Sequence, residues 1–176
     1  MNLKALLYLF LFIFLMGCKQ NQEKKIYPEF VLQNLEGKEI VITKVKNRIQ
    51  IKNQSKPVLL FFIQPSCTQC FTGIEHIERI YEEYKEKITF LAILADSQSQ
   101  AENFKSEAQT LKQNYGLDFD FYYCKGDSLL ESYERQTDTN FIALYDSHLR
   151  LVAEYEGVIA EEMVELNLNQ ILEKRE

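Results

Sequence analysis

The feature that most constrains this chain is a continuous apolar segment that leads into two closely spaced cysteines. Residues 58–63 read Val-Leu-Leu-Phe-Phe-Ile, and Cys67 and Cys70 follow them. A strand with one solvent-exposed face alternates polar and apolar residues, whereas a strand buried on both faces is apolar throughout. We therefore predict a buried central strand that ends at a Cys-x-x-Cys pair.

The rest of the folded region alternates between strand and helix patterns. Helical spacing of apolar residues occurs over residues 70–84, 101–115, 128–135 and 161–174. Short apolar runs that predict strands lie at residues 30–32, 40–42, 58–63, 88–95, 119–123, 141–145 and 149–155. Residues 43–56 fit a further strand or an irregular excursion equally well. This order predicts an α/β fold, with a mixed central sheet, helices on both faces and an N-terminal β-hairpin extension.

The N-terminus is predicted to be a targeting segment. Basic Lys4 precedes an apolar run, Ala5 to Met16, that is too short to span a bilayer and suits a signal peptide. The run ends in Leu-Met-Gly-Cys18, which resembles the lipobox of bacterial lipoproteins. The resemblance implies that Cys18 is lipidated and that the chain is cut before it. The alternative is an uncleaved signal anchor with a free cysteine.

The lipobox divides the chain into three parts. Residues 1–17 are the signal peptide, residues 18–27 the lipidated cysteine and a polar tether, and residues 28–176 the folded domain. This arrangement predicts an extracytoplasmic protein whose partner is a membrane, through a lipid anchor. The net charge of -6 argues against nucleic acid as a partner.

Three cysteines remain once Cys18 is assigned to lipid. Outside the cytoplasm, Cys67, Cys70 and Cys124 are most simply divided into one pair and one leftover thiol. Cys124 ends an aromatic run, and it is either a small buried hydrophobe or a third redox thiol.

The Cys67–Cys70 pair has three possible roles. At the end of a strand and the start of a helix, unpaired backbone N–H groups stabilise a thiolate at Cys67, and Cys70 is near enough to resolve a mixed disulfide. A structural staple across so short a loop would contribute only about 2 kcal/mol. A zinc site needs four ligands, and only Cys124, His76 and His148 are left to supply them, none paired in sequence. We favour a redox pair, with Cys67 as nucleophile and Cys70 as resolving thiol.

Residues 28–176 resemble the thioredoxin-like superfamily and, within it, the TlpA-like extracytoplasmic thiol-disulfide oxidoreductases. The similarity rests on "FVLQNLEGKEI", on "KPVLLFFIQPSCTQC", and on "NFIALYD" followed by "HLRLVAEYEG". It implies a thioredoxin-like fold, protein thiols and disulfides as substrates, and no cofactor beyond the Cys67–Cys70 disulfide. It also implies the reductase direction, with a membrane electron donor of the thiol-reducing type.

The chain departs from the family pattern around the pair. Ser66 replaces a usual Trp, Thr68 and Gln69 lack the frequent Pro, and Phe61 stands where many thioredoxins have a buried acid. Asp138 occupies the position of the family's cis-Pro, and a cis non-Pro bond costs about 3 kcal/mol or more. We expect Thr68, Gln69 and Asp138 to tune the redox properties of the pair, and the Asp138 loop to be shaped differently.

Two other functions are compatible with parts of this pattern. A copper-binding chaperone of the Sco type would use Cys67, Cys70 and His148 as metal ligands, although that family spaces its cysteines by three residues. A peroxiredoxin would carry Thr where Gln64 stands. His76, flanked by glutamates, is expected to be a solvated helix residue.

Overall fold

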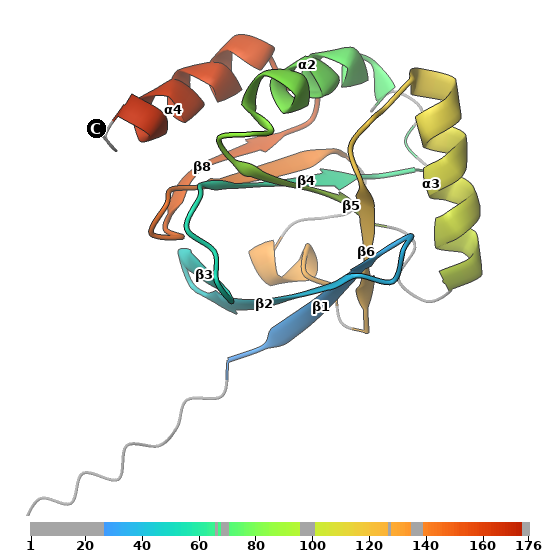
Figure 1. Ribbon diagram of the computed structural model, residues 1–176, viewed down its shortest axis with the longest axis horizontal. Helices are drawn as coiled ribbons and strands as arrows, with labels where there is room; N and C mark the ends of the chain where they lie inside the picture. Colours follow the sequence, from blue (N-terminus) through green and yellow to red (C-terminus); the bar gives the residue numbers. More distant parts are fainter. Residues whose placement is uncertain are drawn as a thin grey trace, which may run out of the picture.

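The computed structural model describes residues 27–65, 67, 71–95, 101–126, 128–134 and 139–173 (Figure 1). The strands are β1 (Glu29–Asn34), β2 (Glu39–Val45), β3 (Arg48–Ile51), β4 (Val58–Ile63), β5 (Thr89–Leu94), β6 (Phe121–Lys125), β7 (Phe141–Tyr145) and β8 (Leu151–Glu156). The helices are α2 (Ile74–Tyr84), α3 (Ala101–Tyr115), the 3-10 helix η2 (Glu131–Tyr133) and α4 (Glu161–Glu173). These strands form one sheet in the order β3-β2-β1-β6-β5-β4-β7-β8.

Strand β4 lies inside the sheet, as its continuous apolar sequence predicts. It pairs in parallel with β5 and antiparallel with β7, so the sheet is mixed. Every residue of β4 is at most 1% exposed. Its side chains alternate between two cores, with Leu59, Phe61 and Ile63 in one and the other three in the second. The prediction of a strand buried on both faces is confirmed.

The two faces of the sheet are covered in different ways. Helices α2, α3 and α4 all contribute buried residues to the core that holds Phe61, which we call the helix-side core. The opposite core, which holds Phe62, contains Leu129, Leu130 and Tyr133 from the segment around η2, and we call it the hairpin-side core. Figure 1 shows α2 and α4 side by side above β4 and β8, and η2 between those strands and β2. The predicted α/β fold is therefore present. Among the described residues, the hairpin-side face is covered by a 3-10 turn and not by an α-helix.

The N-terminal hairpin extension wraps around the hairpin-side core. Residues 43–56 were predicted to form either a further strand or an irregular segment. They contain a third short strand, β3. The Ile49 N–H donates to the Leu149 carbonyl at 3.0 Å, and the Leu151 N–H donates to the Asn47 carbonyl at 2.8 Å. The two ends of the sheet therefore meet at this corner, because Leu151 is the first residue of β8.

Two helices differ from their sequence predictions. Helix α2 begins at Ile74 and not near Cys70, after Gly73 in a left-handed conformation with φ 84°. The sequence spacing that puts Met163, Leu166 and Ile171 on one side of α4 does not predict its buried face, because the first two face solvent. They are 56% and 60% exposed, because the buried stripe of α4 runs instead through Val164, Leu168 and Ile171. None of the helices described is long and apolar enough to cross a bilayer.

A buried hydroxyl pair in the hairpin-side core offers a test of its packing. The Tyr133 and Tyr145 hydroxyl oxygens lie 2.6 Å apart, and burial raises the pKa of both phenols. Tyr145→Phe leaves the Tyr133 hydroxyl without this partner, so the free energy of unfolding in urea should fall by about 1–3 kcal/mol. The double variant Tyr133→Phe/Tyr145→Phe should recover most of the loss, since neither polar group remains. A double variant less stable than the single one would contradict this account.

Candidate active site

Cys67 lies just beyond the carboxyl end of β4, in a turn. The Cys67 N–H donates to the Gln64 carbonyl at 3.1 Å, which closes the turn immediately after the buried strand. Cys67 is half-buried, and its sulfur is in a disulfide bond. Cys124 is 4% exposed and takes part in no disulfide bond, so it is not the partner. This burial agrees with the first of the two roles considered for Cys124, a small buried hydrophobe.

Several predicted site residues lie outside the described residues. Cys70, Thr68 and Gln69 are among them, as are Asp138 and Cys18. The pairing of Cys67 with Cys70 and the shape of the Asp138 loop therefore stay predictions. We expected the helix to start directly at Cys67, but the regular helix α2 starts at Ile74. Residues 68–70, which lie between Cys67 and α2, are outside the described residues, so a helix-stabilised thiolate at Cys67 stays a prediction.

Asn140 supports the Cys67 turn, and sequence reasoning missed it. Its side-chain oxygen accepts a hydrogen bond from the Gln64 N–H at 3.3 Å, and its carbonyl accepts one from the Gly157 N–H at 2.9 Å. Asn140 and Gln64 are 5% and 6% exposed. Asn140 therefore connects the turn that carries Cys67 to the start of β7 and the end of β8. The one available signal was a polar residue directly before the apolar run 141–145.

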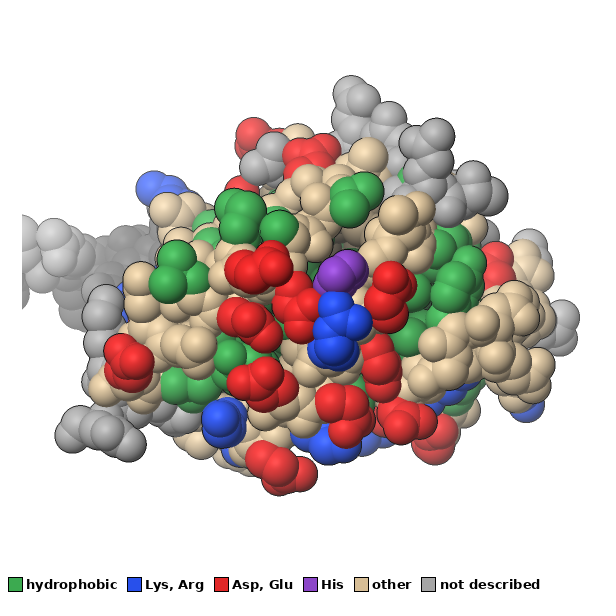
Figure 2. Space-filling view, turned by 90° about the horizontal axis from the view of Figure 1, so that it is seen from above, with side chains coloured by type: hydrophobic (Ala, Val, Ile, Leu, Met, Phe, Trp, Pro, Cys, Tyr) green, Lys and Arg blue, Asp and Glu red, His purple; other side chains and the backbone are tan. Residues whose placement is uncertain are grey.

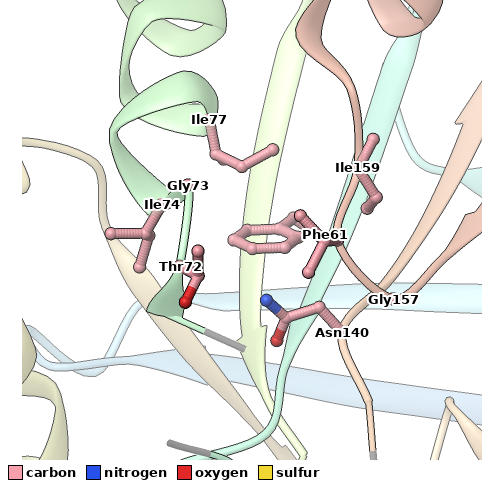
Figure 3. A pocket seen from close by; sticks show the side chains of 9 residues that line it. Phe61, Thr72, Gly73, Ile74, Ile77, Asn140, Gly157 and Ile159 are labelled. Carbon is pink, nitrogen blue, oxygen red and sulfur yellow. The ribbon is translucent and has the colours of Figure 1, made fainter. Parts of the chain in front are cut away.

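A narrow crevice lies between this support and the start of α2 (Figure 3). Its walls include Phe61, Gly73, Ile77, Asn140 and Ile159, and its volume is about 10 Å³. That is room for one water molecule at most. Figure 3 shows the Phe61 ring between Ile77 and the Asn140 amide. Since Phe61 occupies the position of the family's buried acid, the lining of this crevice offers an amide and no carboxylate for proton transfer.

A charged cluster joins the first turns of α2 and α4. Glu161, the first residue of α4, accepts hydrogen bonds from Arg79 at 2.6 Å and from His76 Nδ1 at 2.8 Å. His76 is a helix residue with a side chain 42% exposed, as expected, and it also links the two helices through Glu161. Arg79, and then His76, hold the pKa of Glu161 below its ordinary value. Because the folded pKa is depressed, this stabilisation is present above the pKa of an unfolded glutamate and is lost as pH falls through the folded value.

The surrounding surface of α2 and α4 is acidic. Figure 2 shows this face, with acidic side chains around a basic side chain and a histidine. The contributing glutamates are Glu75, Glu78, Glu82, Glu83, Glu161, Glu162 and Glu165. The face therefore disfavours acidic partners near the start of α2.

His148 is placed far from Cys67. It is exposed in the turn between β7 and β8. Val58 pairs with Tyr145, and Phe62 pairs with Phe141, so this turn lies at the start of β4 and Cys67 lies past its end. At about 3.3 Å per residue, the length of β4 alone separates the two by about 17 Å. The copper ligand set with His148 is therefore wrong, because the antiparallel pairing of β7 sends His148 to the opposite end of the sheet.

Comparisons with known proteins agree with this architecture. The model of the AhpC/TSA family matches residues 24–174. The thiol-disulfide oxidoreductase ResA of Halalkalibacterium halodurans is 28% identical over 137 residues, which are 77% of this chain and 69% of that protein.

Two solved structures show the same thioredoxin-like fold. The pneumococcal exposed lipoprotein thioredoxin Etrx1 of Streptococcus pneumoniae is 19% identical with a TM-score of 0.58, covering 81% of this chain and 99% of its own. BsSco, a member of the Sco family of cytochrome c oxidase assembly proteins, is 15% identical with a TM-score of 0.56, covering 82% and 92%. At these identities the two structures establish the fold alone.

The Asn140 support can be tested by removing its polar group. Asn140→Leu keeps the approximate volume but leaves the buried Gln64 N–H without its acceptor, which should cost about 1–3 kcal/mol of stability. Native-state hydrogen exchange at the Gln64 and Cys67 amides should become faster, while exchange in β1 should not change. Thr139→Val, which removes an exposed contact to Glu156, is the matched control. Equal exchange in both variants would show that Asn140 does not hold the turn.

Proposed function

This chain belongs to the AhpC/TSA family, and from that premise we propose that it is a membrane-anchored, extracytoplasmic thiol-disulfide oxidoreductase. It exchanges a Cys67–Cys70 dithiol or disulfide with protein substrates, and it works as a reductase. The observation that carries this proposal is a disulfide-bonded Cys67 in the turn after a fully buried strand. The relative named as a thiol-disulfide oxidoreductase supports the same chemistry.

The reaction proceeds by two exchanges between sulfur atoms. In the reduced protein, the Cys67 thiolate attacks one sulfur of a client disulfide. The client S–S bond breaks, a mixed disulfide forms, and the second client sulfur leaves as a thiolate that takes a proton from water. The Cys70 thiolate then attacks the Cys67 sulfur, which releases the client as a dithiol. Two electrons pass to the client, and the protein is left with a Cys67–Cys70 disulfide.

The disulfide at Cys67 corresponds to the product side of this cycle. A reductase must therefore regain two electrons and two protons from an external dithiol. We assign that role to a membrane electron donor of the thiol-reducing type, on the strength of the resemblance to TlpA-like proteins. Anchoring by a lipid on Cys18 would hold the domain near such a donor, with residues 18–27 as a tether before β1. The pneumococcal neighbour is itself described as an exposed lipoprotein.

Trapping of clients tests the exchange reaction. Cys70→Ser removes the resolving thiol, so mixed disulfides with client proteins should accumulate at Cys67 and appear on non-reducing gels. Cys67→Ser should trap none. Cys124→Ser is the matched control, because Cys124 is buried and in no disulfide bond, and it should trap no more than the parent protein.

The same proteins separate the remaining functions. Tight Cu(I) binding without trapped clients would favour the copper chaperone, and His148→Ala should not alter any copper binding because His148 is remote from Cys67. Rapid reduction of hydrogen peroxide without client trapping would favour a peroxiredoxin. Either result would overturn the proposed oxidoreductase.

The lipid anchor has its own test. Cys18→Ala should abolish acyl labelling, and the protein should leave the membrane fraction because the acyl chains supply its attachment. Asn21→Ala, in the same polar segment, is the control and should remain labelled and membrane-bound. A Cys18→Ala protein that stays in the membrane without being cut would indicate a signal anchor instead.

A further inference from the structure

A groove runs beside the cysteine turn, between that turn and α3. It is lined by Pro65, Phe71, Thr110, Leu111, Asn114 and Tyr115, among others, and its volume is about 310 Å³. This volume is at the lower end of the range for binding pockets. We call it the α3 groove.

The walls of the α3 groove are largely aromatic and aliphatic. The rings of Phe71 and Tyr115 stack with centroids 5.0 Å apart and an angle of 15° between their planes. Tyr115 is 43% exposed, although it belongs to this stacked pair. The Thr110 hydroxyl donates to the Ser106 carbonyl within α3, so its donor is already used. The groove therefore offers aromatic surface to a ligand, with the exposed Asn114 amide at its rim.

The α3 groove is within reach of a client attached to Cys67. Pro65 precedes Cys67 by two residues, and Phe71 directly follows Cys70. Because an extended chain spans at most about 3.6 Å per residue, Pro65 lies within about 7 Å of Cys67. In an extended client segment bonded to Cys67, the residues two to four positions from the cysteine reach about 7–14 Å from it. Such residues can enter the groove while the mixed disulfide persists.

We propose that the α3 groove binds the client chain beside its cysteine, and that it selects extended segments with an aromatic or long aliphatic side chain two to four residues away. Glu107, which also lines the groove, disfavours an acidic residue at that position. This inference rests on the proposed function and names its substrate class: unfolded, apolar, non-acidic segments around a cysteine. An aromatic client side chain would extend the stack of Phe71 and Tyr115.

Reduction rates of matched disulfides test the proposal. The reduced full-length protein is mixed with two peptide disulfides that differ only in Phe or Ser three residues after the cysteine, and with 2-hydroxyethyl disulfide, which has no neighbouring chain. The Phe peptide should react about two- to tenfold faster than the Ser peptide, since aromatic pairs favour binding by that factor. Tyr115→Ala should remove this preference, so that the Phe and Ser peptides react at similar rates.

Two further variants complete the experiment. Thr110→Trp fills the groove from an exposed position of α3 and should also abolish the preference for Phe. Tyr27→Ala removes a similarly exposed tyrosine outside the groove and should preserve it. A protein that reduces all three disulfides with no preference, or whose preference survives both groove variants, would refute the α3 groove alone. A protein that reduces none of them would refute the proposed function itself.

Discussion

The burial of β4 on both faces is the constraint on which the rest of the structure depends. A strand in this position must satisfy its backbone through β5 and β7, and it must place alternate side chains in two separate cores. The helices fill one core, and the curled N-terminal strands with the η2 segment fill the other. Cys67 follows this rigid strand by a single turn, so its position is fixed by the packing of both cores.

The sequence predicts the strands well because burial leaves a local pattern. The apolar run of β4 and the helical spacing of α3 both correspond to the observed elements. The start of α2 could not be read in the same way, because left-handed Gly73 interrupts a spacing that continues on both sides of it. In α4, two apolar stripes compete, and only packing against α2 and the sheet decides that Val164 is buried and Met163 exposed.

The candidate site was only partly predictable for a related reason. Cys67 stood out through its spacing, and its disulfide fits a redox pair. Asn140 and Glu161 act through contacts with residues far away in the chain, and neither belongs to a motif. His148 illustrates the reverse error, because the type of residue suited a metal but the antiparallel pairing of β7 carries it away. Residue type indicates possible chemistry, whereas strand topology decides which groups meet.

The outer edge of β8 has a consequence for molecules held close together on a membrane. Beyond Leu151, the described part of the sheet provides no neighbour on that side of β8, so its backbone could pair with the same strand of another copy. The exposed face of this strand carries Glu154 and Glu156. Antiparallel pairing of two copies would bring these carboxylates near one another, and like charges across strands are destabilising. Repulsion between these carboxylates therefore opposes edge-to-edge association of β8 strands from two copies.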